Sequence, residues 1–256
     1  MDNAQKNGNR TSTKFVNLKT YLQDDYAVKE AYKTLRTNLQ FCGDDIHVIA
    51  ITSCMPNEGK STISLELGKS LAELGKKVLL IDADLRKSAL VSKYADKSGI
   101  EGLSQFLSGQ ATLQDVLYST QYPNFYMIFS GAFPPNPVEL LSKSKFKDFI
   151  DNAKNTFDYI IIDCPPLGSV IDAAVVANVC DSAIMVISAN TISAKFAKNV
   201  KIQLEKSGCR ILGAVLNNIE EKRGGYYKGY YYSKYYRSYY KKYGNYGYYG
   251  HTEDKK

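Results

Sequence analysis

Short apolar runs that alternate with amphipathic helical patterns are the feature of this sequence that most limits its fold. The runs expected to be strands cover residues 47–52, 77–82, 124–131, 157–163, 182–188 and 210–217, and the longer helical patterns cover 27–41, 60–74, 135–155 and 193–206. Runs without polar alternation are typical of strands buried on both faces, and helical connections join parallel strands. The sequence therefore predicts an α/β domain with a mostly parallel central sheet and helices on both faces.

The length of the chain suits one sizeable core. It has 256 residues, of which 44% are hydrophobic, and chains of this size bury a single core. We expect a flexible leader over residues 1–25, one domain over 26–220 and a disordered tail over 221–256. The leader is polar, and no later segment approaches the roughly 18 apolar residues of a membrane span, so we expect a cytoplasmic protein.

The cysteines do not form a recognisable framework. Five of them lie at scattered positions without a CxxC pair, and the chain has only two histidines. Such spacing is not typical of disulfide-rich domains or of zinc sites. We therefore expect reduced thiols.

The end of the chain differs from the rest in composition. Thirteen of the 21 tyrosines lie between Tyr226 and Tyr249, interleaved with Gly, Lys, Arg and Ser and without aliphatic residues. Such a segment cannot bury a core of its own. From Glu221 onward nine Lys or Arg face three acids, so this end carries +6 of the net charge of +7 and leaves +1 for the rest. A near-neutral domain is not typical of a nucleic-acid binder.

The strand expected at 47–52 runs into a glycine-containing turn and a helix. From Ser53 to Thr62 the chain reads SCMPNEGKST, of which GKST matches the second half of a phosphate-binding loop. A strand that turns into a helix there points backbone N–H groups and the positive helix end at phosphates. Cys54 replaces the usual first glycine, and an ordinary strand-to-helix turn is the alternative interpretation of this segment alone. The residues expected to bind the nucleotide are Pro56, Asn57, Glu58, Gly59, Lys60, Ser61 and Thr62.

Acidic residues end two of the expected strands. Asp82 and Asp84 follow the run VLLI, and their spacing of two places both side chains on the same side. Asp163 ends the run YIII in the same way. Ligand sites in open parallel sheets lie at this edge, and the Mg²⁺ of a nucleotide provides the counter-charge that buried carboxylates need. One such Asp is more often a helix cap, whereas three beside a GKST loop indicate a nucleotide–metal site.

These motifs together resemble the bacterial P-loop tyrosine kinases of capsular and exopolysaccharide synthesis, which are related to the division-site and plasmid-partition ATPases. The resemblance covers about residues 26–256, and its most discriminating part is the hydrophobic-DxDxR segment that ends at Arg86. The family's GEGKST loop reads NEGKST here, with Asn57 in place of glycine, and Met55 stands where the partition ATPases carry an extra lysine. The resemblance implies a P-loop NTPase fold and a protein tyrosine kinase that uses ATP and Mg²⁺.

The resemblance also implies roles for the matching residues. Lys60 would stabilise the transferred phosphate, Asp82 would act near the metal and as base for the acceptor tyrosine, and Arg86 would assist locally. Phosphoryl transfer depends mainly on positioning and charge neutralisation, for which these groups are adequate. The implied catalytic residues are Lys60, Asp82, Asp84 and Arg86, and the implied metal site is Ser61, Asp82, Asp84 and Asp163.

Two further segments resemble family features. The family's ExxRxxR oligomerisation motif reads Glu30, Lys33 and Arg36 here, which implies a homo-oligomer, with a ring as one form. Lys33 keeps the charge but lacks the two-pronged guanidinium, and a surface helix with ion pairs three residues apart explains the spacing equally well. The segment PPNPVELL (residues 134–141) also resembles the family, although a proline-led helix start explains it equally well.

The tyrosine cluster resembles the family's autophosphorylation site. About 25 extended residues at ~3.3 Å each span about 80 Å, enough to enter the active site of a neighbouring copy. Each phosphotyrosine adds roughly −1.5 to −2 charges, so about four cancel the charge of the tail. A low-complexity tail that only adheres to membrane or nucleic acid is the alternative. The expected acceptors are Tyr226, Tyr227, Tyr230, Tyr231, Tyr232, Tyr235, Tyr236, Tyr239, Tyr240, Tyr243, Tyr246, Tyr248 and Tyr249.

Partners follow from the same resemblance. It implies a separate transmembrane activator that regulates polysaccharide chain length and recruits the kinase to the inner face of the cell membrane. It also implies a cognate phosphotyrosine phosphatase, and nucleic acid is not expected. Two other functions stay open at this point: a partition-type ATPase that switches an assembly without phosphorylating protein, and a non-catalytic scaffold that binds polyanions.

Overall fold

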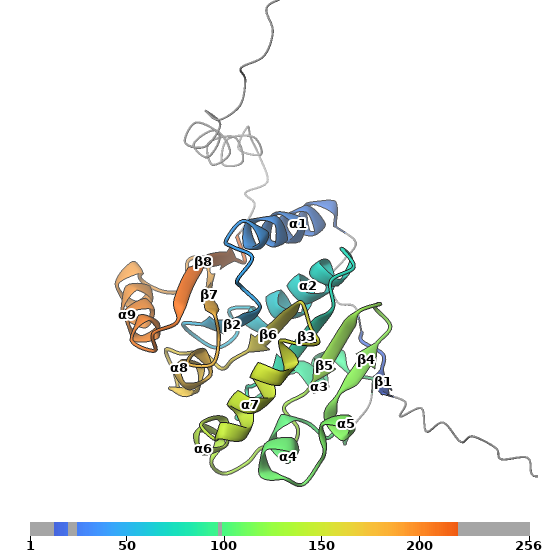
Figure 1. Ribbon diagram of the computed structural model, residues 1–256. Coiled ribbons are helices and arrows are strands. Elements are labelled where there is room, and N and C mark those ends of the chain that lie inside the picture. The colour runs from blue at the N-terminus through green and yellow to red at the C-terminus, as the bar shows by residue number, and fades with distance from the viewer. Residues whose placement is uncertain (1–12, 20–24, 97–98, 220–256) are drawn as a thin grey trace, which may run out of the picture. The chain divides into compact units, whose positions relative to one another are not determined.

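A single eight-stranded sheet forms the centre of the protein (Figure 1). The computed structural model describes residues 13–19, 25–96 and 99–219. The strand order is β1-β4-β5-β3-β6-β2-β7-β8, and all neighbours run parallel except β4 and β5. The prediction of a mostly parallel sheet is therefore confirmed. The strands are β1 (Lys14–Val16), β2 (Val48–Ser53), β3 (Val78–Asp82), β4 (Tyr118–Thr120), β5 (Phe125–Ile128), β6 (Tyr159–Asp163), β7 (Ser182–Ser188) and β8 (Arg210–Asn217).

Helices cover both faces of this sheet, as predicted (Figure 1). One face packs against α1 (Tyr26–Gln40), α2 (Lys60–Ala72) and α3 (Leu90–Tyr94). The other face packs against α4 (Leu103–Ser108), α5 (Leu113–Val116), α6 (Pro137–Leu141), α7 (Ser144–Ala153), α8 (Asp172–Ala177) and α9 (Ala194–Glu205).

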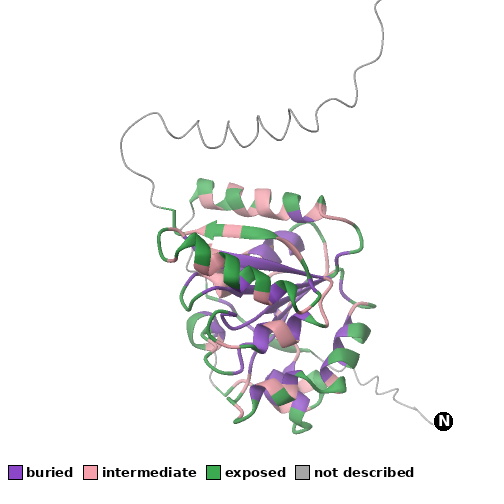
Figure 2. Ribbon diagram, turned by 90° about the vertical axis from the view of Figure 1, so that its left-hand side faces the viewer, coloured by how far each residue is buried: buried purple, intermediate pink, exposed green. Residues whose placement is uncertain are grey.

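The central strands are buried on both faces, which explains their unbroken apolar sequences. All six residues of β2 are buried, with Ile49 and Ile51 in the core beneath α1–α3 and Val48 and Ala50 in the opposite core. Figure 2 shows the same layering, with buried strands between half-buried and exposed helices. The carboxyl ends of β2, β3 and β6 meet at one edge, where a site can form.

Several elements differ from the expectation. The helix expected over 135–155 is two helices, because the hydroxyl of Ser142 donates to the carbonyl of Val138 at the end of α6 and Lys143 is extended (ψ 147°) before α7. The strands β1 and β4 and the helices α3 and α8 were not predicted.

The flexible leader expected over residues 1–25 contains a short strand that was not predicted. Residues Lys14–Val16 form β1, which pairs with β4 in parallel at one edge of the sheet. Val16 and Leu18 are 0% and 3% exposed and join the core beneath α1–α3. Two apolar side chains thus hold a polar segment against the domain.

The remaining expectations about the chain concern cross-links, membrane spans and the tail. All five cysteines are free. Within the described ranges, no helix is both long and apolar enough to cross a bilayer. The compact unit ends at Ile219, and the expected disordered tail with its acceptor tyrosines lies outside the described residues.

Candidate active site

The loop between β2 and α2 has the backbone geometry that its sequence predicts. Asn57 has a φ of 65°, the left-handed region that Asn tolerates better than most residues. Gly59, which precedes α2, has a φ of 92°, and a Cβ there would lie 2.1 Å from Nδ2 of Asn217. Glycine is therefore required at position 59 both by conformation and by space.

Glu58 holds this loop from within. Its carboxylate is 2% exposed and accepts the backbone N–H of Met55 at 2.7 Å and that of Ser188 at 3.2 Å. The amide of Asn217 donates to the Glu58 carbonyl at 2.9 Å. The carboxylate of Glu58 thus ties the loop to the end of β7, and its backbone carbonyl ties the loop to the end of β8.

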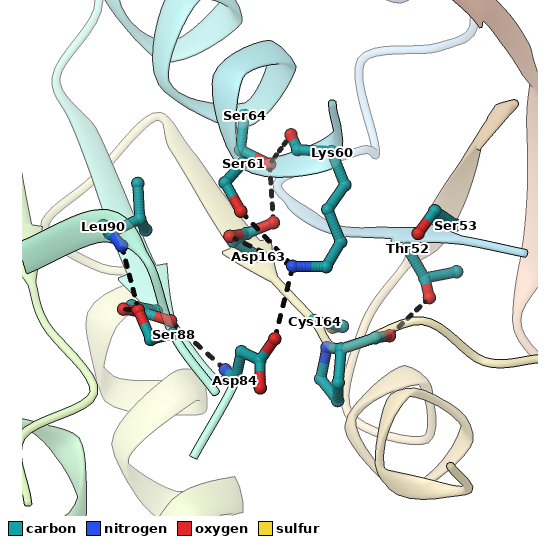
Figure 3. Close-up of polar contacts among 12 residues, drawn as sticks. Thr52, Ser53, Lys60, Ser61, Ser64, Asp84, Ser88, Leu90, Asp163 and Cys164 are labelled. Carbon is teal, nitrogen blue, oxygen red and sulfur yellow. Dashed lines mark hydrogen bonds and ion pairs between the residues drawn. The ribbon is translucent and has the colours of Figure 1, made fainter. Parts of the chain in front are cut away.

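Lys60 lies at the centre of the candidate site (Figure 3). Its Nζ is 3.3 Å from Oδ2 of Asp84, 3.9 Å from Oδ2 of Asp163 and 3.3 Å from the hydroxyl of Ser61. The hydroxyl of Ser64, one turn further along α2, donates to Oδ1 of Asp163 at 3.2 Å. The structure thus brings together residues from α2, the end of β6 and the segment after β3, as the sequence predicted.

The three carboxylates are buried around this one ammonium group. Asp82, Asp163 and Asp84 are 0%, 1% and 5% exposed. Burial raises the pKa of Asp82 to about 7, and the nearby charge of Asp163 adds to the shift. Burial also raises the pKa of Asp163, although Lys60 opposes that shift. One lysine does not neutralise three carboxylates, so the site has a surplus of negative charge.

Asp82 and Asp84 play different parts in the segment after β3. The hydroxyl of Ser88 donates to Oδ2 of Asp82, whose Oδ1 accepts the backbone N–H of Asp84 at 3.2 Å. Oδ1 of Asp84 accepts the backbone N–H groups of Arg86 and Lys87 at 3.3 and 3.0 Å. The segment is thus folded around its own carboxylates, and Oδ2 of Asp84 is the oxygen that faces Lys60.

The guanidinium of Arg86 is engaged by a second acid. Its Nε and NH2 donate to the two carboxylate oxygens of Asp172 at 2.8 and 3.0 Å. The side chain of Asp172, at the start of α8, is fully buried, whereas that of Arg86 is 41% exposed. The pair fastens the segment after β3 to α8.

The residues fit Mg²⁺ bound together with a nucleotide. Within the described ranges, no three His, Cys, Asp or Glu side chains form a ready-made metal cage. Mg²⁺ characteristically uses one or two protein oxygens together with phosphates and waters. The surplus negative charge at Asp82, Asp84 and Asp163 and the hydroxyl of Ser61 beside Lys60 meet that requirement.

The three residues of the expected oligomerisation motif lie on α1, away from this loop. Lys33 pairs with Glu30 at 2.7 Å, and both side chains are exposed. Arg36 donates to the backbone carbonyl and hydroxyl of Ser70 on α2 at 2.7 and 3.1 Å. Arg36 therefore fixes α1 to α2 within the chain.

Four residues of the site were not predicted from the sequence. Ser64 and Ser88 hold carboxylates, Asp172 holds Arg86, and Asn217 contacts the loop. Asn217 ends an apolar strand as the predicted acids do, which was a usable signal. The others are common polar residues on helices or turns, and only their three-dimensional neighbours reveal them.

Comparisons with known proteins identify the relatives of this chain. The family model AAA_31, described as an AAA domain, matches residues 46–210. The tyrosine-protein kinase CpsD of Streptococcus agalactiae is 40% identical over 228 residues, which cover 89% of this chain and 92% of that protein. The match therefore covers most of this chain and nearly all of the relative.

Solved structures share the fold. The chimerical protein CapA2B2 has a TM-score of 0.74 at 29% identity and covers 81% of this chain and 95% of its own. The kinase domain of the Escherichia coli tyrosine kinase ETK has a TM-score of 0.71 at 33% identity and covers 78% of each chain. The septum site-determining protein MinD of Pyrococcus horikoshii, solved with Mg-ADP, has a TM-score of 0.58 at 30% identity and covers 69% of this chain and 72% of its own.

This chain is thus a nucleotide-binding P-loop protein, and it belongs to the family of bacterial tyrosine-protein kinases that includes CpsD.

Proposed function

We propose that this kinase transfers the γ-phosphoryl group of Mg-ATP to tyrosines between Tyr226 and Tyr249 of another copy, and so regulates capsular or extracellular polysaccharide synthesis. The observation that carries the proposal is the position of Lys60 beside Asp84 and Asp163 at the end of a phosphate-binding loop. Its positive charge is placed for a nucleotide's terminal phosphates. The tyrosine-rich tail supplies acceptors on the same chain.

The proposed reaction balances with the groups of this site. In this reaction the Asp82 carboxylate takes the proton of the acceptor hydroxyl as a general base. The tyrosine oxygen bonds to the γ-phosphorus while the bond from that phosphorus to the β–γ bridging oxygen breaks, and ADP leaves. Lys60 stabilises the negative charge on the transferred group, and loop N–H groups hold the β-phosphate.

The proposed metal residues are Ser61, Asp82, Asp84 and Asp163. Bound Mg²⁺ would neutralise charge on the β- and γ-phosphates. Arg86 has a positioning role in this proposal, because Asp172 engages its guanidinium. The nucleotide itself is proposed to bind along residues 56–62, with Glu58 contributing through the shape of the loop.

The proposed partners follow the family. A transmembrane activator would recruit the kinase to the inner face of the membrane, a phosphatase would reverse the modification, and copies would assemble through α1. A chimera combines parts of different proteins in one chain, so the likeness to CapA2B2 supports a search for a partner. For assembly, the exposed Glu30 and Lys33 are the available part of the motif, because Arg36 is used within the chain.

Phosphotyrosine mapping tests the proposed function. The protein is incubated with Mg-ATP and the cytoplasmic part of a candidate activator, and its tyrosines are mapped by mass spectrometry beside a Lys60→Met variant. The proposal predicts ATP-dependent phosphotyrosine between residues 226 and 249 in the wild type and none in the variant. It is wrong if no such phosphotyrosine forms with an activator that works on a related kinase in parallel.

A further inference from the structure

A cavity of about 400 Å³ lies between α4 and the chain that leads from β5 into α6. Phe133, Pro134 and Pro135 form its apolar side, and the ring of Phe133 is 59% exposed. Ser104 and Glu139 are among its polar residues. This is the PPNPVELL segment, whose role the nucleotide site leaves unexplained.

The sheet places this cavity next to the acidic segment. β5 pairs with β3 in parallel, with Ile128 opposite Ile81. The residues that follow, 129–131, therefore leave the sheet beside Asp82–Asp84, and the cavity begins at the next residue, Ala132. The strand order β5-β3-β6-β2 puts the phosphate-binding loop on the other side of the carboxylates. An acceptor that approaches the γ-phosphate past Asp82 comes from the side of this cavity.

The walls of the cavity are fixed by backbone contacts. The N–H of Leu103 donates to the carbonyl of Phe129 at 2.7 Å, and that of Ser104 to the carbonyl of Ser130 at 3.0 Å. A Cβ on Gly102 would lie 2.2 Å from the Phe129 carbonyl, so the start of α4 sits directly against the end of β5. A preformed cavity of this kind is typical of a binding site.

We propose that this cavity, with its rim at Phe133, Pro134 and Pro135, is the docking groove for the tyrosine-rich segment of a second copy of this chain. The proposal rests on the proposed function and names the part of the enzyme that holds the acceptor segment. The segment repeatedly carries two or three adjacent tyrosines followed by a small or basic residue, as in YYKGYYYSKYYRSYY. Tyrosine rings suit an aromatic and proline surface because they bury apolar area while their hydroxyls reach polar partners.

Rings, not charge, provide the binding in this groove. Glu139 and Lys143 both line it and offset each other, whereas the segment that would bind is basic. Neutral polar groups such as Ser104 and Asn136 lie where tyrosine hydroxyls need partners. Several pairs of adjacent tyrosines in the segment can bind the groove in this way. Each binding position brings a different tyrosine to Asp82.

The second copy is the natural source of the segment. In its own chain the tail leaves after β8, at the opposite edge of the sheet from the cavity, with β3, β6, β2 and β7 between β5 and β8. The 37 residues after Ile219 span about 120 Å at ~3.3 Å each, which suffices to reach a neighbour.

Photo-crosslinking tests the contact without catalysis. The full-length Lys60→Met chain carries a benzophenone amino acid in place of Phe133, is mixed with a ¹⁵N-labelled full-length copy and is irradiated. The proposal predicts crosslinks to labelled residues 226–249. A chain with the same probe in place of Ile202, which is 42% exposed on α9, is the control and is expected to give none. Crosslinks that fall elsewhere, or only on the unlabelled tail of the same chain, would overturn the proposal.

Kinetics test the groove in the reaction. Wild-type and Phe133→Ser chains phosphorylate the Lys60→Met chain, and Ile202→Ser is the matched control. Loss of an aromatic anchor that binds substrate is expected to raise KM for the acceptor chain about tenfold with kcat and nucleotide affinity unchanged. An unchanged KM in Phe133→Ser, while the wild type modifies the tail, contradicts the groove and leaves the kinase standing. Failure of the wild type to modify the tail at all, in the presence of an activator that works on a related kinase, counts against the proposed function instead.

Discussion

At the scale of single residues, the site places more negative charge in the interior than the protein itself neutralises. Asp82, Asp84 and Asp163 are all buried, and Lys60 is the ammonium group that lies among them. Burial works to lower the pKa of Lys60, but the three carboxylates together raise it above its ordinary value. The nucleotide-free site is therefore strained electrostatically, and the Mg²⁺ of the proposed reaction would relieve that strain.

The pH dependence of stability tests this surplus charge. The pKa of Asp82 rises from 3.8 to about 7 on folding, so its contribution to stability is full below about pH 4 and is lost as pH rises through 7. Asp82→Asn has no carboxyl group to ionise, so the variant does not lose this contribution to stability as pH rises. The Tm of the nucleotide-free variant in EDTA should exceed that of the wild type at pH 8, by a margin that shrinks toward pH 5. Thermal unfolding followed by circular dichroism measures the Tm of the wild type and of the variant at each pH.

Asp181 provides a control of opposite sign. Burial would raise its pKa, but the hydrogen bonds from Lys154 and from the backbone N–H groups of Val48 and His47 lower it below its ordinary value. Its stabilisation is present above the unfolded pKa and is lost as pH falls through the folded one. Asp181→Asn should therefore lower the Tm at pH 8. A lower Tm for Asp82→Asn under the same conditions would contradict the assigned burial penalty.

The residues of the site that belong to a short sequence motif could be predicted, and the others could not. Lys60, Asp84 and Asp163 meet because each follows a buried strand or begins a helix at the same sheet edge, a relation readable from the chain. Ser88 and Asp172 were missed because their partners depend on how the segment after β3 folds back and where α8 begins. No local sequence pattern predicts the contact of Ser88 with Asp82 or that of Asp172 with Arg86.

At the scale of elements, the pair of Arg86 and Asp172 connects the segment after β3 to α8. Arg86→Ala leaves the fully buried Asp172 carboxylate without that partner, whereas Asp172→Asn leaves a half-exposed guanidinium that water can reach. We expect Arg86→Ala to lower the free energy of unfolding by about 2 kcal/mol and Asp172→Asn by less. Urea denaturation of the nucleotide-free protein measures the difference, and the reverse order would contradict the role assigned to the pair.

A second prediction at this scale concerns the contribution of β1 to stability. Val16 is fully buried, whereas Phe15 is 50% exposed. Val16→Ala should cost about 2 kcal/mol of stability because it leaves a cavity in the core, and Phe15→Ala should cost less. Chemical denaturation of the two variants compares them. Equal and negligible losses would show that this segment does not belong to the sheet in solution.

Two of the elements that could not be predicted, β1 and β4, are formed by long-range pairing. β1 and β4 are three residues each, too short for a clear period, and they become strands because they pair with each other at the sheet edge. The break between α6 and α7 depends on the local capping of Ser142 and the extended Lys143. The strands β7 and β8, by contrast, follow the predicted ranges 182–188 and 210–217 because their apolar runs are long.

At the scale of the whole molecule, the charge of the chain is concentrated from Glu221 onward. That part carries +6 of the total of +7, and each phosphotyrosine removes roughly 1.5 to 2 charges, so about four cancel this charge and more reverse its sign. Binding to vesicles that contain anionic lipid should therefore weaken after phosphorylation. Co-sedimentation before and after incubation with Mg-ATP measures it, with neutral vesicles as control. Equal binding in both states would show that the tail is not an electrostatic switch.

The most direct test of phosphorylation between copies mixes two full-length chains. One carries Lys60→Met and keeps its tail tyrosines, and the other is active with all thirteen tail tyrosines replaced by phenylalanine. With Mg-ATP and an activator that works on a related kinase, phosphotyrosine should form between residues 226 and 249 of the Lys60→Met chain, and only when the active copy is present. Absence of phosphotyrosine from that segment under these conditions would contradict transfer from one copy to the tail of another.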